Sequence, residues 1–325
     1  MPLLLNKNDV MQVLDMNDCI NVIEKAFAEL SNGTAVLPLR INIKPDAGLA
    51  LYMPAYLKEM GALACKVVTV YKDNPAKHNL PTTIGKVLLQ NPDTGEVICI
   101  MDGGYLTAVR TGAASGVATK LLARKDANQT VAVYGTGVQA KMQLWAVACV
   151  ASVAKVLVYD LNEAAADAFV KEMSEKHKLN VVKCANPDDL LDSDIIITAT
   201  SSATPLWDGN KLKDGTHINN IGSHTPGARE LDTITVKRSL FVGDSREACF
   251  AEAGDIMIPL KEGAITEDHF YAELGEIITG KKAARTDNKQ ITLFKSNGLA
   301  IQDAATAKLV YEKALAMGIG QNVNI

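Results

Sequence analysis

The sequence predicts an α/β protein with two domains, one α+β in character and one built on a doubly wound parallel sheet. Two observations support this fold class. Strand-like segments follow one another between residues 39 and 102, with a helix before them and another after them. From residue 127 onward, strands and helices alternate, which is the pattern of a parallel sheet with helices on both faces.

The first domain, residues 1–126, is expected to begin with an amphipathic helix and to continue as an antiparallel or mixed sheet. Apolar residues from Ile20 to Leu30 recur at helical spacing. Asn17 or Asp18 is expected to cap this helix and Gly33 to end it. The segments "LRINI", "LALYMPA", "LACKVVTVY", "TTIGKVLLQ" and "EVICIMD" then read as strands separated by turn signals such as "PDAG" and "NPDTG".

The second domain, residues 127–298, contains the alternating strands and helices. The helix before it, "YLTAVRTGAASGVATKLLAR", carries small residues around Gly112 that would let another backbone approach closely. Residues 299–325 are predicted to form a long helix. We expect this helix to return to the first domain and complete it, with the small-residue helix as one possible docking surface.

Composition excludes several classes of protein. The chain has 325 residues, 48% hydrophobic and 22% charged, with a net charge of −4 and no Lys/Arg run that would attract nucleic acid. Its longest apolar runs are far shorter than the ~20 residues of a membrane span, and no signal-peptide pattern opens the chain. The six cysteines form no C-x-x-C pair and the five histidines show no metal-ligand spacing. A cytoplasmic protein without a metal site is expected.

A glycine-rich turn indicates nucleotide binding. Residues 135–140, "GTGVQA", match G-x-G-x-x-A directly between a predicted strand and a predicted helix. Gly135 would permit the tight turn, Gly137 the approach of a pyrophosphate, and Ala140 close packing of helix and strand, as in Rossmann domains. Asp160 ends the next strand at about the 20-residue spacing expected of a ribose-binding acid. A carboxylate there favours NAD and disfavours NADP.

Further candidates lie where later strands end, because ligands bind beyond the carboxyl ends of a doubly wound sheet. Thr200 is the last residue of "IIITAT", with a solvated turn as the alternative interpretation. His224 follows "THINNIG" in the stretch "NNIGSHTPGARELD", which would lie beside the nicotinamide. A histidine suits proton transfer near neutral pH, but it is equally well explained as a loop residue bonded to the backbone.

Three cations in the first domain have unusual surroundings. Lys66 lies in the apolar strand "ALACKVVTVY", where a lysine is rare unless it is paired, functional or on a strand edge facing water. Arg40 opens a strand, and Arg110 is the only charge in "LTAVRTGAASG". Arginine binds carboxylates through its planar fork, although either arginine alone could form a structural salt bridge. Together the three predict a small anionic substrate, a carboxylate.

These motifs resemble the ornithine cyclodeaminase/mu-crystallin family, and within it the alanine dehydrogenase and ketimine reductase branch. The resemblance runs nearly end to end through "LPLR", "YMPA", "KVV", "NPAKHNLPTTIG", "PDTGEV", "LTAVRTGAASGVAT", "YGTGVQA", "NNIGSHTPGARELD" and "FKSNGLAIQDAATA". It implies a homodimer whose first domain carries the substrate site and the dimer contact. The second domain would bind NAD(H) or NADP(H).

The resemblance also implies roles for individual residues. Arg40 and Lys66 match the substrate-carboxylate and catalytic-lysine positions, and Arg110 matches an arginine between substrate and cofactor. Together with the glycine motif, the residues expected to contact the cofactor are Thr82, Arg110, Gly135, Gly137, Val138, Gln139, Asp160, Thr200, Ile221, Gly222 and Ser296.

The stretch around His224 separates the activities of the family. The cyclodeaminase branch carries an aspartate where this chain has His224 and a lysine where it has Ala228. A histidine is a poor partner for the second ammonium of ornithine, so ornithine cyclodeaminase becomes the alternative. The predicted function is an NAD(P)-dependent oxidoreductase acting on the C–N bond of a small amino or imino acid. It would be an alanine dehydrogenase or a ketimine or Δ1-pyrroline-2-carboxylate reductase, with Lys66 and His224 as catalytic residues. A non-enzymatic, nucleotide-binding protein like mu-crystallin is the second alternative.

Overall fold

The structure is a computed structural model that describes residues 1–223 and 225–324. The chain divides into two compact units, which are described separately. Unit 1 comprises Met1–Arg110 and Leu299–Ile325, and unit 2 comprises Thr111–Gly298.

Helix α4 (Gly103–Leu122) runs through the division between the units. The change of sequence pattern near residue 126 therefore comes later in the chain than the division made by long-range contacts. A helix is held by local hydrogen bonds, so it can continue from one compact unit into the next. Gly112 on this helix allows close packing within unit 2. A Cβ at Gly112 would lie 2.5 Å from the carbonyl oxygen of Met142 on helix α5 (Val138–Val150).

Unit 1 is built on a mixed sheet. Its strands are β1 (Leu3–Leu5), β2 (Ala35–Val36), β3 (Ile41–Ile43), β4 (Leu49–Leu57), β5 (Ala62–Val70), β6 (Thr83–Gln90), β7 (Val97–Asp102) and β16 (Gln321–Asn322). The strand order is β16-β1-β7-β6-β5-β4-β2, with β3 paired to β4. Strands β4 to β7 form an antiparallel meander, whereas β1 runs parallel to β7.

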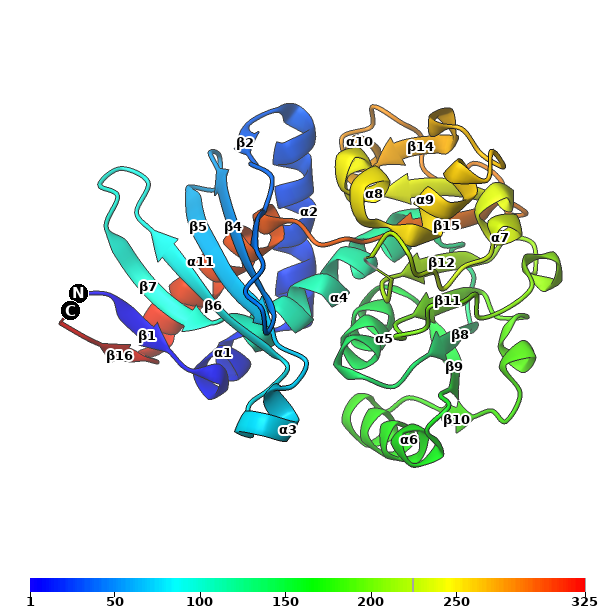
Figure 1. The fold of residues 1–325 in the computed structure, drawn as a ribbon, viewed down its shortest axis with the longest axis horizontal. Helices are drawn as coiled ribbons and strands as arrows, with labels where there is room; N and C mark the ends of the chain where they lie inside the picture. The colour runs from blue at the N-terminus through cyan, green and yellow to red at the C-terminus, as the bar shows by residue number, and fades with distance from the viewer. Residues whose placement is uncertain (224, 325) are drawn as a thin grey trace. The chain divides into compact units, whose positions relative to one another are not determined.

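The helices of unit 1 include one from the far end of the chain. They are α1 (Lys7–Val13), α2 (Met16–Asn32), α3 (Asn74–His78) and α11 (Ala300–Met317). Helix α11 packs against β4, β5, β6 and α2, so the last long helix belongs to the same unit as the first strands (Figure 1).

The predicted cap of helix α2 was wrong, while its predicted end was right. Asp15 caps the helix, and its carboxylate accepts a hydrogen bond of 2.8 Å from the backbone N–H of Asn17. Asp15 has the extended conformation that a cap requires, whereas Asn17 and Asp18 are already helical. Gly33 ends the helix with φ of 76°, a left-handed conformation that glycine adopts without strain.

Alternation along β4, β5 and β6 divides the sheet into two faces. The inner face is the one whose side chains are buried: Met53, Ala55, Leu57, Ala62, Ala64, Lys66, Val68, Val87 and Leu89. Lys66 is the one charged side chain among these otherwise apolar inner-face residues. The edge-strand reading of Lys66 was therefore wrong, since β5 lies between β4 and β6 and the side chain is 2% exposed.

Unit 2 is a doubly wound parallel sheet. Its strands are β8 (Gln129–Tyr134), β9 (Val153–Tyr159), β10 (Val181–Lys183), β11 (Ile195–Thr198), β12 (His217–Asn220), β13 (Ser239–Gly243), β14 (Phe270–Glu273) and β15 (Ile291–Lys295). The order is β10-β9-β8-β11-β12-β15-β13-β14, and the paired strands are parallel. The chain first moves outward from β8 to β10 and then restarts at β11 on the other side of β8. The crevice for a ligand is expected at this switch point.

Helices cover both faces of this sheet, which confirms the predicted fold class. The helices of unit 2 after α4 are α5, α6 (Glu163–His177), α7 (Thr233–Arg238), α8 (Arg246–Glu252), α9 (Gly254–Lys261) and α10 (Leu274–Ile278). Short 3-10 turns occupy Pro187–Leu190, Gly209–Lys211 and Glu267–His269. Val131 and Val133 on β8 pack into a core with α5 and α6, while Ala132 and Tyr134 point into a second core on the opposite face.

Two further properties concern the described part of the chain. No helix there combines the length and apolar character needed to cross a membrane. The six cysteines are free thiols, and three of them, Cys19, Cys99 and Cys249, are buried.

Candidate active site

A buried cluster of charges lies on the inner face of the unit 1 sheet. The carboxylate of Asp303 on α11 lies between two cations. Its Oδ2 is 2.8 Å from Lys66 Nζ on β5, and its Oδ1 accepts a hydrogen bond of 3.0 Å from Arg110 Nε on α4. Lys66, Arg110 and Asp303 are 2%, 4% and 1% exposed. A cluster of charges with so little solvent exposure is rare in a protein core and is expected only where the charges pair or act on a ligand.

The environment of Lys66 sets its protonation. Burial, the positive charge of Arg110 and, more weakly, that of Arg40 lower the pKa of Lys66 from 10.5 to about 8, while Asp303 opposes this shift. Lys66 can therefore exchange a proton near neutral pH, as an acid/base group in catalysis must. The cations surrounding the single carboxylate leave an excess of positive charge around Lys66.

Arg110 is held at two points by consecutive residues of α11. Its Nε group donates to Asp303, and its Nη1 group donates to the side-chain oxygen of Gln302. These contacts fix the plane of the guanidinium. A guanidinium with a fixed plane can present its remaining edge to a carboxylate.

The other two candidates of unit 1 lie in segments that lead into strands. Arg40 is half-buried just ahead of β3, and its charge acts on Lys66. Thr82 is half-buried just ahead of β6, where its carbonyl accepts a hydrogen bond of 2.8 Å from the Tyr71 N–H. The structure thus brings Arg40, Lys66 and Arg110 within one electrostatic cluster. The cofactor role of Thr82 stays a prediction from the resemblance.

The glycine-rich turn of unit 2 has the geometry of a phosphate cradle. Gly135 has φ of 93°, and a Cβ there would lie 2.6 Å from the carbonyl oxygen of Ala199, so only glycine fits. Gly137 begins helix α5, and a Cβ on it would meet no atom of the described chain within 4 Å. The space beside Gly137 at the N-terminus of α5 is therefore open, and a helix N-terminus stabilises an anion that binds there.

The neighbouring side chains also fit a dinucleotide. Val138 is 63% exposed beside the turn, and Gln139 has a buried Oε1 with no hydrogen-bond partner among the described residues. Asp160 lies just after β9, where its carboxylate accepts hydrogen bonds from the Thr136 hydroxyl at 2.7 Å and the Asn162 N–H at 2.9 Å. The turn and the acid are thus joined directly. Placed at the end of the second strand, this carboxylate suits the hydroxyls of a ribose.

A buried glutamate joins the ends of β11 and β12. Glu230 accepts hydrogen bonds from the N–H and hydroxyl of Thr200, both at 2.7 Å, from the Asn220 side chain at 3.0 Å and from the Gly222 N–H at 2.9 Å. A Cβ on Gly222 would lie 2.4 Å from the Glu230 carboxylate. Burial raises the pKa of Glu230, and the Thr200 hydroxyl bond opposes that rise. Glu230 therefore shapes the strand ends that carry Thr200, Ile221 and Gly222.

A second buried network lies at the end of β15. Lys295 pairs with Asp255 at 3.2 Å and donates to the carbonyl of Ser223. Asp244 accepts hydrogen bonds from the Gly298 N–H at 2.7 Å and, more weakly, from the Ser296 hydroxyl at 3.4 Å. Ser296 is thereby held at the same edge of the sheet as Thr200, since both follow parallel strands.

Asp303 and Glu230 were not predicted from the sequence, and neither were the buried residues Asp244, Asp255 and Lys295. A signal existed for Asp303, because it is the only charge in "NGLAIQDAATA", the same feature that singled out Arg110. Glu230 lies in the quoted stretch around His224, but nothing in that stretch distinguishes a buried glutamate from a solvated one. His224 itself lies outside the described residues, so its role stays a prediction.

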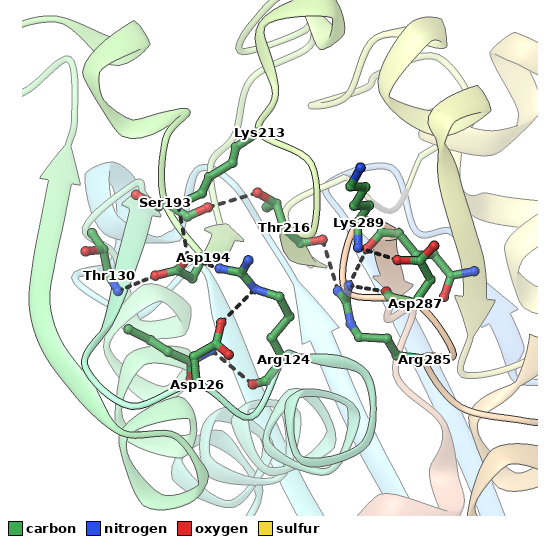
Figure 2. Close-up of polar contacts among 12 residues, drawn as sticks. Arg124, Asp126, Thr130, Ser193, Asp194, Lys213, Thr216, Arg285, Asp287 and Lys289 are labelled. Carbon is green, nitrogen blue, oxygen red and sulfur yellow. Dashed lines mark hydrogen bonds and ion pairs between the residues drawn. The ribbon is translucent and has the colours of Figure 1, made fainter.

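A different polar cluster occupies the opposite edge of the unit 2 sheet, where the strands begin. Figure 2 shows Asp194 paired with Arg124 and Lys213. The carboxylate of Asp194 also accepts a hydrogen bond of 2.9 Å from the Thr130 N–H. Arg285 donates to backbone carbonyls around the starts of β12 and β15, including that of Thr216. The end of the sheet where the strands begin lies away from the glycine turn, and the contacts there join the loops that precede the strands.

Comparison with known proteins identifies relatives along the whole chain. The ornithine cyclodeaminase/mu-crystallin family matches residues 1–318. A Δ1-pyrroline-2-carboxylate reductase of Bacillus cereus is 38% identical over 325 residues, covering 99% of each chain.

Two solved structures extend this comparison. The Thermococcus litoralis Δ1-pyrroline-2-carboxylate reductase, in complex with NADH and L-proline, is 48% identical with a TM-score of 0.94, covering 99% of this chain and 100% of that one. An archaeal alanine dehydrogenase dimer with bound NAD is 35% identical with a TM-score of 0.94, covering 100% and 99%. These matches confirm the resemblance, and the chain belongs to the ornithine cyclodeaminase/mu-crystallin family.

Proposed function

We propose that this chain is an NADH-dependent reductase of a cyclic ketimine, Δ1-pyrroline-2-carboxylate, and that its product is L-proline. The observation that carries this proposal is the buried cluster of Lys66, Arg110 and Asp303. Two arginines and one carboxylate act on Lys66, so the surroundings are net positive and attract one carboxylate. The same charge repels a substrate with a second ammonium, which disfavours ornithine and with it the cyclodeaminase alternative.

The relatives support this choice of substrate. Relatives matched along nearly their whole length include Δ1-pyrroline-2-carboxylate reductases, and the one from Thermococcus litoralis was solved with NADH and L-proline. Alanine dehydrogenase remains the second candidate because the archaeal relative has the same fold at lower sequence identity. Both reactions act at a carbon that carries a carboxylate and a C–N bond, which is the feature that the cations would hold.

The proposed reaction needs a hydride for the imine carbon and a proton for the ring nitrogen. NADH, when bound, supplies the hydride that forms the new C–H bond, and a proton must reach the ring nitrogen to complete the amine. Arg40 and Arg110 hold the substrate carboxylate, which fixes the adjacent imine carbon. Lys66 binds the same carboxylate or delivers the proton, and either role requires its charged form. His224 is proposed as a secondary acid/base or orienting group.

We propose NAD rather than NADP as the cofactor of unit 2. The Gly135–Gly137 turn and the open N-terminus of α5 suit the pyrophosphate. Asp160 offers a carboxylate to the ribose hydroxyls and would repel a 2′-phosphate. The relatives solved with NADH and NAD agree with this preference.

We also propose that the protein is a homodimer in the cytoplasm. The outer face of the unit 1 sheet presents apolar side chains to solvent. When one face of an antiparallel sheet is open to solvent, the side chains on that face are ordinarily polar. The exposed apolar residues of β3, β4 and β6 are Ile41, Ile43, Tyr52 and Ile84. A second copy of this chain is the proposed occupant, and the archaeal alanine dehydrogenase relative is a dimer. The free thiols fit a reducing compartment.

A substrate panel tests the function. Purified protein is assayed with NADH and with NADPH against Δ1-pyrroline-2-carboxylate, its six-membered homologue, pyruvate plus ammonia, and ornithine. We expect the five-membered imine with NADH to give the highest kcat/KM. Lys66→Met should abolish turnover, while Lys58→Met, an exposed lysine at the β4–β5 turn, should not. Tight NADH binding without turnover of any imine would favour the non-enzymatic alternative.

A further inference from the structure

Helix α11 contributes its first turn to the buried charge cluster. Asp303 lies in that turn, where the helix dipole stabilises an anion, and the N-cap residue Leu299 offers no side-chain acceptor. The carboxylate is 1% exposed and engages Lys66 through one oxygen and Arg110 through the other. Each oxygen therefore has a distinct cationic partner from a different element of unit 1.

We propose that Asp303 is a positioning residue of the reductase: it keeps Lys66 charged and sets the plane of Arg110, so that both cations face the substrate carboxylate. This inference rests on the proposed function. Asp303 would itself bind no substrate, because its oxygens are directed at the two cations. It acts through Lys66 and Arg110.

Asp303 is the group around Lys66 that stabilises the charged form of the lysine. On β4 and β6 the cross-strand partners of Lys66 are Met53 and Val87, which are apolar. Helix α4 contributes Arg110 and the segment before β3 contributes Arg40, both cations. Among the described groups that act on Lys66, only Asp303 favours its charged form. Removing this carboxylate leaves burial and two positive charges, all of which lower the pKa of Lys66.

The consequence for the reaction is a pH dependence. Imine reduction adds a hydride to carbon and a proton to nitrogen, and both proposed roles of Lys66 need the ammonium form. With the pKa of Lys66 at about 8 in the unliganded protein, kcat/KM should fall as the pH rises above that value. Without Asp303 the fall should begin at lower pH, by about 1 to 3 units, the usual effect of a close opposite charge.

The experiment compares Asp303→Asn with the wild type in pH profiles of kcat/KM for Δ1-pyrroline-2-carboxylate, which report the ionisation of the free enzyme. The matched control is Asp18→Asn, which removes another carboxylate that joins α2 to α11 through Lys313 but touches neither Lys66 nor Arg110 among the described contacts. The substrate's own ionisation is common to all variants. The proposal expects the alkaline limb to move to lower pH in Asp303→Asn and to stay in Asp18→Asn. An unmoved limb in Asp303→Asn would overturn it.

A second readout separates this inference from the proposed function. The folded pKa of Lys66 lies below its unfolded value of 10.5, so the unfolded chain binds more protons between about pH 8 and 10.5. Stability relative to Lys66→Met should therefore rise with pH across this window. The same comparison is made between Asp303→Asn and the double variant Asp303→Asn/Lys66→Met. There the rise in stability with pH should begin at lower pH. This melting experiment needs no substrate, so it tests Asp303 even if no imine is turned over.

Rescue covers the case in which Asp303→Asn does not fold. Asp303→Glu keeps the charge but displaces it by one methylene. The proposal expects the alkaline limb of Asp303→Glu to remain near that of the wild type while kcat falls, because Arg110 is reoriented. The electrostatic role would be contradicted if the alkaline limb of Asp303→Glu, which still has a carboxylate, moved as far as is predicted for Asp303→Asn.

Discussion

Glu230→Gln tests whether this glutamate anchors the strand ends that carry the proposed cofactor contacts Thr200 and Gly222. Each oxygen of the Glu230 carboxylate accepts from a pair of donors: the N–H and hydroxyl of Thr200 on one side, and Asn220 and Gly222 on the other. Glutamine keeps one acceptor and turns the other into a donor. One pair of donors then faces an NH2 group. If that pair is Asn220 and Gly222, both hydrogen bonds are lost; if it is Thr200, the N–H bond is lost and the hydroxyl rotates to accept.

The expected loss follows from these contacts. Hydrogen bonds to a charged acceptor contribute about 1.5–3 kcal/mol each, so losing one or two of them costs about 1.5–6 kcal/mol. Burial raises the pKa of Glu230, which means that removing the charge relieves part of its desolvation. The hydrogen-bond loss should exceed this relief, for a net destabilisation of about 2–4 kcal/mol. NADH binding should weaken about tenfold, because the Thr200 and Gly222 backbones lose their common anchor.

The assay is urea denaturation followed by circular dichroism, together with a fluorescence titration with NADH. The control is Glu262→Gln, a half-exposed glutamate bonded to Thr233 and Arg229, for which the loss should stay below about 1 kcal/mol. If Glu230→Gln is as stable as Glu262→Gln and binds NADH as tightly as the wild type, the proposed anchoring is wrong.

Three other predictions concern separate features. Asp160→Ser should raise the NADPH/NADH ratio of kcat/KM at least about tenfold, because the carboxylate proposed to bind the ribose is gone; an unchanged ratio in steady-state assays would refute that role. Val67→Asp, on the outer face of the unit 1 sheet, should yield monomers in light scattering after gel filtration, and a persistent dimer would place the interface elsewhere. Arg285→Met should lower stability by about 2–4 kcal/mol through lost carbonyl contacts, with NADH affinity unchanged; weaker NADH binding would contradict the separation of the two edges.

Local patterns carried the prediction of the fold. The alternation of strands and helices after residue 127 and the "GTGVQA" turn are both set by residues close together in the sequence. The observed parallel sheet and its glycine turn agree with the predictions made from these local patterns. The start of α2 was misplaced because several polar residues could cap it, and only the backbone conformation of Asp15 decides among them.

Long-range pairing explains what the sequence could not supply. Lys66 and Arg110 stand out as charges among apolar neighbours, so a pattern detects them. Their partner Asp303 comes from the far end of the chain, and no spacing rule links it to either cation. Glu230 is likewise recognised only when the ends of β11 and β12 are brought together by the sheet.

The most direct test of the proposed function follows the hydride itself. The protein is incubated with Δ1-pyrroline-2-carboxylate and NADH deuterated at C4, and the product is examined by chiral chromatography and mass spectrometry. The proposed function predicts L-proline carrying deuterium at its α-carbon, formed in step with NADH oxidation and absent with Lys66→Met. If NADH binds yet no labelled proline forms, or the label appears only in alanine from pyruvate and ammonia, the proposed substrate is wrong.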